Sequence, residues 1–245
     1  MKRYDILSLF PEIVLAPLRG SIVGRAQEKG LLQIEVVNFR EFAQDKHRVV
    51  DDLPFGGGPG MVLKVEPIFA AVQQCLQSGP RARVILMSPQ GRRFDQALAK
   101  ALALEDHLIF ICGRYKGVDE RVREALVTDE LSIGDYVLSG GELPALLVIE
   151  ALVRLIPGVL GDEESARGDS FYEGILDHPH YTRPAVFEGR AVPPVLISGH
   201  HEQIRRWRRK EALRRTRTRR PDLLRTAPLN EEDRALLEEI EREGN

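Results

Sequence analysis

Short apolar runs alternate with amphipathic segments along the first two thirds of the chain. Runs typical of buried strands occupy Tyr4–Phe10, Leu32–Phe39, Arg83–Met87, Leu108–Cys112 and Glu130–Ile133. Each of the last three runs is followed by a glycine-bearing loop and then by a segment with helical spacing. This alternation predicts an α/β fold in which parallel strands are joined by crossover helices.

Helix starts are indicated by the residues that favour them. Ser21 is expected to cap a short helix ending at Gly30, and Pro67 suits the first turn of a helix that runs to about Gln77. Three further helices are expected to begin near Asp95, Asp119 and Glu142.

The loops after the three later strands carry the sequences SPQGRRF, GRYKG and GDYVLSGG. In a parallel sheet these loops meet at the carboxyl edge, where free N–H groups suit polar ligand atoms. Because neither GxGxxG nor GxxxxGK[ST] is present, a standard dinucleotide or NTPase site is not indicated. The local pattern leaves two interpretations open, a ligand crevice or ordinary glycines at strand-to-helix turns. An earlier glycine-rich loop, DKHRVVDDLPFGGGPGM, is long enough to indicate a functional or mobile segment.

The sequence changes character after Pro157, which together with the next glycine ends the last of these helices. Residues 161–168 (GDEESARG) are small and acidic and have no apolar period, so they are typical of a linker at a domain boundary. The proline-rich stretch 178–199 is expected to lie extended. Asn230 is expected to cap a last, mostly acidic helix.

Charge is distributed unevenly along the chain. The formal net charge is -2, yet between His200 and Arg225 eleven Lys and Arg residues stand against three acids. Ile204, Trp207 and Leu213 give this segment a partial apolar stripe, which predicts a helix packed on one side and basic on the other. Such a face suits a phosphate backbone, although charged helix faces are also often plain solvated surface.

Several kinds of site are not indicated. The six histidines have no zinc-like spacing, and HPH at 178–180 is a weak pattern, so no metal is expected. Cys75 and Cys112 lie in apolar surroundings typical of buried thiols. The start of the chain lacks the apolar region of a secretory signal, and no run is long enough to span a membrane, so we expect a cytoplasmic protein without a membrane partner. By position alone, Asp169 is one more solvating charge beside the linker.

Taken together, seven stretches resemble one known family. In order along nearly the whole chain, DDLPFGGGPGM, SPQGRRF, ICGRYKGVDERV, LSIGDYVLSGGELPAL, RLIPGVLG, DSFYEGILDHPHYTRP and HEQIRRW are similar to bacterial tRNA (guanine-N1-)-methyltransferases of the TrmD type, in the SPOUT class. The resemblance implies transfer of a methyl group from S-adenosylmethionine to N1 of the guanosine at tRNA position 37, next to the anticodon.

The same resemblance implies a particular architecture. It implies a SPOUT-type parallel sheet with a deep trefoil knot formed by the segments around residues 83–146, in a homodimer with the active site at the subunit interface. We therefore expect a methyltransferase domain with the S-adenosylmethionine site in residues 1–160, a flexible linker in residues 161–172 and a small, mainly helical tRNA-binding domain in residues 173–245.

Roles for single residues also follow from the resemblance. Asp169 corresponds to the base that takes the N1 proton of guanine, and Arg154 to the arginine that stabilises charge growing on O6. The cofactor would be bound, largely through the backbone, by Pro89, Gly113, Ile133, Gly134, Asp135, Tyr136, Val137, Leu138 and Gly141. Lys116 departs from the family's GRYEGVDERV, where a glutamate is implicated in Mg²⁺ dependence. A Mg²⁺ requirement is therefore in question for this chain.

Two alternatives from other functional classes stay open on the sequence alone. One is a non-enzymatic RNA-binding protein that uses only its basic helix, and the other is a SPOUT enzyme acting on a different RNA base. Uptake of S-adenosylmethionine distinguishes the first alternative, and the position of the methylated nucleotide distinguishes the second.

Overall fold

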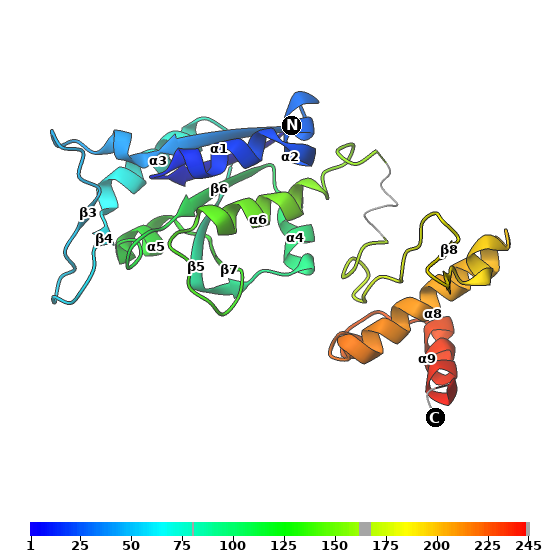
Figure 1. The fold of residues 1–245 in the computed structure, drawn as a ribbon. Helices are drawn as coiled ribbons and strands as arrows, with labels where there is room; N and C mark the ends of the chain where they lie inside the picture. Colours follow the sequence, from blue (N-terminus) through cyan, green and yellow to red (C-terminus); the bar gives the residue numbers. More distant parts are fainter. Residues whose placement is uncertain (80, 162–167, 244–245) are drawn as a thin grey trace. The chain divides into compact units, whose positions relative to one another are not determined.

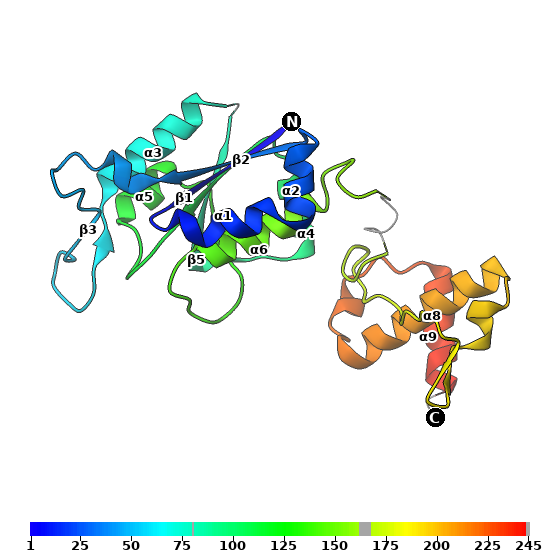
Figure 2. The same cartoon turned by 45° about the horizontal axis from the view of Figure 1, so that its top comes forward.

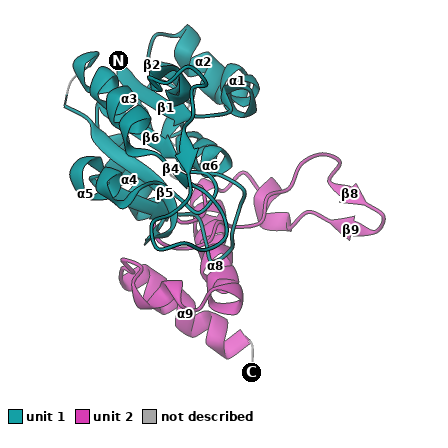
Figure 3. Cartoon of the chain, turned by 90° about the vertical axis from the view of Figure 1, so that its left-hand side faces the viewer, with its two compact units in different colours: residues 1–161 teal, residues 162–245 magenta. Residues whose placement is uncertain are grey.

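The computed structural model describes residues 1–79, 81–161 and 168–243. The chain divides into two compact units, Met1–Gly161 and Asp162–Asn245 (Figure 3). Each unit has its own apolar core. Within the described ranges, none of the helices has the length and apolar character needed to cross a membrane.

The first unit is built on a five-stranded sheet with the order β2-β1-β6-β5-β7. Every ladder in this sheet is parallel, which confirms the predicted α/β alternation. The strands are β1 (Lys2–Ser8), β2 (Leu32–Asn38), β5 (Arg83–Arg93), β6 (His107–Cys112) and β7 (Asp129–Ser132).

Helices cover both faces of this sheet (Figures 1 and 2). One face is covered by α1 (Pro11–Arg19), α2 (Ser21–Glu28), α4 (Gln96–Ala103) and α6 (Glu142–Val153), and the other by α3 (Val65–Gln77) and α5 (Glu120–Leu126). Along β6, Leu108 and Phe110 belong to the first core and Ile109 and Ile111 to the second. Because successive strand residues face opposite sides of a sheet, β6 contributes side chains to both cores. Every residue of β6 is buried between the two helix layers.

Two helix predictions in the first unit need correction. Helix α1 was not predicted at all, because a strand was expected to continue to Phe10, whereas β1 ends at Ser8. Ser21 does not cap α2: it is the first helical residue, its φ is 54°, and Gly20 occupies the N-cap position without a side-chain hydrogen bond.

The other helix starts follow the sequence more closely. The Asp95 side chain accepts a hydrogen bond from the Leu98 N–H at 2.8 Å, and Asp119 accepts one from the Arg121 N–H at 3.0 Å. The predicted helix around Pro67 is α3. Both cysteines are buried and carry free thiols, as the apolar surroundings predicted.

Strand β5 is longer than predicted, because the stretch SPQGRR forms strand rather than loop. Met87 and Arg92 both pair with Leu131 of β7, so the residues between them form a bulge. A Cβ atom at Gly91 would lie 2.4 Å from the carbonyl carbon of Glu130, and only glycine permits this approach of the two backbones. The earlier glycine-rich loop is the tip between two short paired strands, β3 (Asp51–Asp52) and β4 (Val62–Leu63).

The second unit contains two packed helices, α8 (His201–Arg219) and α9 (Glu231–Glu243). Before them, the proline-rich stretch, which is described throughout, contains no α-helix, and its regular elements are a short hairpin of β8 (Val186–Phe187) with β9 (Arg190–Ala191) and a single 3-10 turn. Asn230 caps α9 as predicted: its Oδ1 accepts from the Asp233 N–H at 2.9 Å, while Asp233 Oδ2 accepts from the Asn230 N–H at 3.1 Å. The core between these elements consists of Ile175, Ala212, Leu213, Leu236 and Ile240.

The basic side of α8 is largely neutralised by α9, which corrects the prediction of a wholly basic face. Acidic side chains of α9 form ion pairs with six cations of α8. The pairs are Arg205–Glu232, Arg206–Glu239, Arg209–Asp233, Lys210–Glu239, Arg214–Glu243 and Arg217–Glu241. In contrast, Arg208, Arg215 and Arg219 form no ion pair with any residue in the described ranges.

These ion pairs make the stability of the second unit depend on pH. Hydrogen bonds from Lys210 and Arg214 lower the pKa of Glu243 to about 2, and hydrogen bonds from Lys210 and Arg206 lower the pKa of Glu239. A carboxylate with a lowered pKa stabilises the fold above its ordinary pKa of 4.5, and the contribution is lost as the pH falls through the folded pKa.

We therefore predict that the unfolding temperature of the second unit falls between pH 4.5 and about 2. The decrease should be shallower in the Glu239→Gln/Glu243→Gln variant, which lacks both titrating groups. Fluorescence of Trp207, the sole tryptophan, reports the unfolding of this unit. Glu238→Gln is the matched control, since Glu238 pairs with Arg242 of its own helix. Equal pH profiles in all three proteins would contradict the prediction.

Candidate active site

The outer part of β5 and the loops that follow β6 and β7 enclose a pocket at the carboxyl edge of the sheet. Its volume is about 460 Å³, which is in the range of small-molecule sites. Most of its wall comes from residues 86–90 of β5, residues 113–118 after β6, and residues 130–134 and 136–141 at the end of β7 and beyond it, three segments that the strand pattern predicted to meet.

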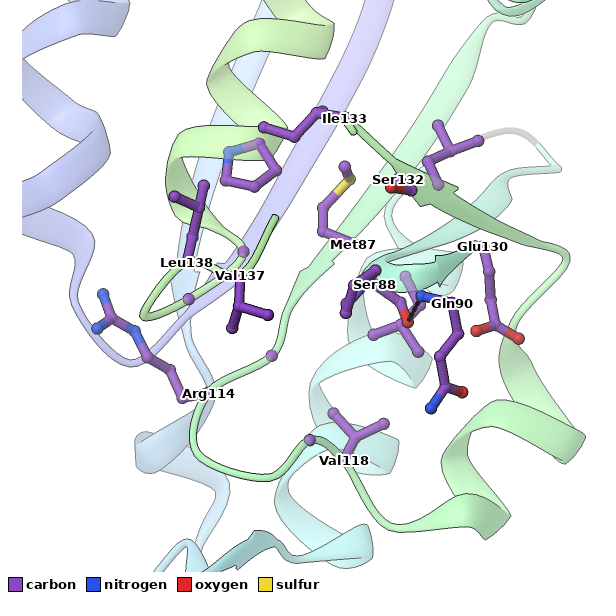
Figure 4. A pocket seen from close by; sticks show the side chains of 18 of the residues that line it. Met87, Ser88, Gln90, Arg114, Val118, Glu130, Ser132, Ile133, Val137 and Leu138 are labelled. Atoms are coloured by element: carbon purple, nitrogen blue, oxygen red, sulfur yellow. Dashed lines mark hydrogen bonds between the residues drawn. The ribbon is translucent and has the colours of Figure 1, made fainter. Parts of the chain in front are cut away.

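The wall of this pocket is part apolar and part polar. In Figure 4 the apolar side chains of Met87, Ile133 and Val137 surround one part of the pocket, and the polar side chains of Gln90 and Glu130 surround another. Such a pocket suits a ligand that has both apolar and polar parts.

Two glycines are required at the two ends of the loop between β7 and α6. Gly134 has a φ of 143°, a conformation that residues with a side chain rarely adopt. A Cβ atom at Gly141 would lie 2.8 Å from Cys112 Cα and 3.1 Å from the Gly113 nitrogen. The Gly141 N–H donates to the Gly113 carbonyl at 3.0 Å, so a hydrogen bond joins the start of α6 to the residue that follows β6.

A buried carboxylate beneath the pocket escaped the sequence analysis. Glu142, the first residue of α6, is only 1% exposed and accepts a hydrogen bond from the Ser8 hydroxyl at 2.7 Å. Its other oxygen lies 3.0 Å from Arg114, whose guanidinium is stacked over the Phe10 ring at 4.5 Å. Gly140 leaves room for this pair, because a Cβ there would lie 2.3 Å from Arg114 Nε. No motif could indicate the network, since its members come from the end of β1, the loop after β6 and the start of α6.

The structure brings most of the expected cofactor residues together. The pocket is lined by Pro89, Gly113, Ile133, Gly134, Tyr136, Val137, Leu138 and Gly141. Asp135, in contrast to the expectation, is exposed and does not line the pocket. Gly134 and Tyr136, on either side of it, do line the pocket.

The two expected catalytic residues belong to different units. Arg154 is the exposed C-cap residue of α6 in the first unit. Asp169 lies in a turn of the second unit, where its carbonyl accepts from the Tyr172 N–H at 3.2 Å, and it lines a second hollow of about 690 Å³. Of the expected flexible linker, residues 162–167 lie outside the described residues, whereas Gly168 to Tyr172 form turns.

Lys116 connects two glycine-rich loops at the edge of the pocket. Its N–H donates to the Met61 carbonyl at 3.0 Å, and a Cβ atom at Gly60 would lie 2.9 Å from Lys116 Cγ. The aliphatic part of this side chain therefore packs against the β3–β4 loop. Lys116 also lines the pocket, so its charge lies beside any bound ligand.

The sequence matches the model of the family described as tRNA (Guanine-1)-methyltransferase TrmD over residues 1–226. A tRNA (guanine-N(1)-)-methyltransferase of Moorella thermoacetica is 60% identical over 98% of this chain and 97% of its own length. Proteins with the same name from Dehalococcoides mccartyi and Dictyoglomus turgidum are 57% and 56% identical, each over 99% of this chain and 98% of their own length. The chain therefore belongs to the tRNA (guanine-1)-methyltransferase TrmD family.

Proposed function

We propose that this protein methylates N1 of the guanosine at position 37 of tRNA, with S-adenosylmethionine as the methyl donor. The observation that carries the proposal is the family match along residues 1–226 in a chain whose three family loops enclose one pocket. Fold alone would not support it, because parallel α/β sheets host many activities.

The pocket suits S-adenosylmethionine in size and chemistry. Its apolar part, around Met87, Ile133 and Val137, suits an adenine ring, and the loop backbones offer hydrogen-bonding groups to the polar ends. Bound S-adenosylmethionine supplies a methyl group that its sulfonium already activates. The task of the pocket residues is therefore to hold and orient the donor rather than to activate it.

The remaining chemistry belongs to side chains of the protein. Guanine N1 carries a proton at neutral pH and is a poor nucleophile until the proton leaves. We assign removal of this proton to the Asp169 carboxylate and stabilisation of negative charge on O6 to the Arg154 guanidinium. Because these residues belong to different units, we further propose a homodimer in which Asp169 of one subunit acts at the pocket of the other.

A trefoil knot in residues 83–146 is part of the proposal. It is supported by the path of the chain after β7, which lies at the sheet edge beside β5. From there the chain passes the end of β5, and the Gly141 N–H donates a hydrogen bond to the carbonyl of Gly113, just beyond β6. Residues 1–161 are then the methyltransferase domain, and residues 168–243 supply tRNA contacts and Asp169.

Single-turnover methylation of tRNA transcripts tests the function. We expect methylation of a transcript with guanosine at position 37, mapped to that nucleotide, and none of a matched transcript with adenosine there. Methylation mapped to another nucleotide in both transcripts would favour a different RNA target, and no uptake of S-adenosylmethionine in calorimetry would favour a plain RNA-binding protein. The same assay with and without Mg²⁺ shows whether a chain with Lys116 requires the ion.

Asp169→Ala should lower the single-turnover rate by a factor of about 10² to 10⁴, because the N1 proton loses its acceptor. Calorimetry should show unchanged affinity for S-adenosylmethionine. Glu173→Ala is the matched control, since Glu173 lines the same hollow and pairs with Arg209. A near-normal rate in Asp169→Ala, or an equal loss in the control, would remove Asp169 from this role.

The uneven pairing along α8 predicts which of its cations contact tRNA. Arg208→Gln/Arg215→Gln should weaken tRNA binding and reduce the slope of log affinity against log salt by roughly one to two, because both cations are available to phosphates. Arg206→Gln/Glu239→Gln removes an existing ion pair and should leave the slope nearly unchanged. Filter binding across a salt series checks both variants, and equal slopes would contradict the assignment.

A further inference from the structure

Three side chains with metal-ligating atoms converge at the start of the proline-rich segment in the second unit. One ligand atom each of Asp177, His178 and His180 lies within 4.8 Å of the others. In sequence, the pattern HPH was too weak to indicate a metal. In the structure, the Nε2 atoms of both imidazoles lie within 4 Å of the Asp177 carboxylate.

The distances between these atoms suit a small tetrahedral ion. The His180 Nε2 lies 2.7 Å from Asp177 Oδ2, and the His178 Nε2 lies 3.7 Å from Asp177 Oδ1. Ligand atoms bound to zinc at about 2.0 to 2.2 Å in tetrahedral geometry are roughly 3.4 Å apart. The two observed separations involve different oxygens of the Asp177 carboxylate and bracket this value, so rotation of the carboxylate and of the exposed His180 side chain can bring both imidazole nitrogens to the spacing of metal ligands.

The ring of His178 is already oriented for ligation. Its Nδ1 lies 3.0 Å from the Pro179 carbonyl, which can only accept, so this nitrogen carries the proton and Nε2 keeps its lone pair. The ring also packs edge-on against Trp207, with 6.5 Å between ring centroids. A hydrogen bond from a ligating histidine to a carbonyl is the usual way in which proteins fix the ring and its tautomer.

Asp177 is held in place as well. Its N–H donates to the Ser170 hydroxyl at 2.9 Å, and one of its carboxylate oxygens accepts from the His178 N–H at 2.6 Å. The side chain of His180 is 69% exposed, against 23% for Asp177 and 18% for His178. The cluster is therefore open to solvent on the side of His180.

We propose that Asp177, His178 and His180 form a binding site for a divalent transition metal of the zinc type. Two imidazole nitrogens and one carboxylate oxygen are a donor set of zinc sites with an open position, whereas Mg²⁺ and Ca²⁺ prefer oxygen ligands. The bound ion fixes Asp177 and, through Ser170, the turn that also carries Asp169. The site does not depend on the methyltransferase activity.

Titration of the full chain, freed of any affinity tag, with Zn²⁺ in a calorimeter tests the site. We expect one saturable site, and Co²⁺ at the same site should give the visible absorption of a tetrahedral ion. His180→Gln and His178→Gln should each weaken binding at least tenfold. A large excess of Mg²⁺ should not displace the ion.

His201→Gln is the matched control, since His201 lies in the same unit outside the cluster and should not affect binding. Far-ultraviolet circular dichroism confirms that each variant is folded, and His180→Gln is well tolerated because the side chain is mostly exposed. Absence of saturable binding, or equal binding by His180→Gln and His201→Gln, would overturn the proposal.

Discussion

The pocket depends on one close contact, between the start of α6 and the end of β6. At Gly141 the backbone approaches Cys112 so closely that any side chain would force the two segments apart. The hydrogen bond from Gly141 to Gly113 then fixes the separation. Because β7 ends on the far side of β5, the loop between β7 and α6 has to pass over the end of β5 to reach this contact. That passage forms part of the wall of the pocket.

The network around Glu142 explains how this contact tolerates a buried charge. A carboxylate that is 1% exposed is costly unless it is paired, and here Arg114 and the Ser8 hydroxyl supply its partners. Arg114 comes from the loop after β6 and also lines the pocket. A ligand that displaced Arg114 would leave Glu142 without its counter-charge, so the network favours a rigid pocket on this side.

The second unit shows why the charge of a segment is a poor guide to its surface. Eleven cations in sequence indicated a basic face, yet α9 covers six of those on α8 with its own acids. Such exposed pairs contribute little stability individually, but they decide which cations remain available to a phosphate. The set of α8 cations that α9 leaves unpaired is therefore smaller than the sequence suggested, and it includes Arg208 and Arg215.

The sequence pattern correctly predicted the features that depend mainly on residues close together in the chain. The alternation of strands and helices follows from the apolar periodicity. The caps at Asp95, Asp119 and Asn230 follow from side chains that accept hydrogen bonds from the backbone. The meeting of three segments at one edge of the sheet follows from the geometry of parallel strands. The motifs, taken in order, also determined the family. The backbone conformation of Ser21 and the extension of β5 through a bulge were not predicted. Both depend on the segments that pack beside them. Only the tertiary structure decided three further features: the Glu142 network, the neutralisation of α8, and the convergence of Asp177, His178 and His180. Each depends on the relative positions of side chains, which their spacing along the chain does not encode.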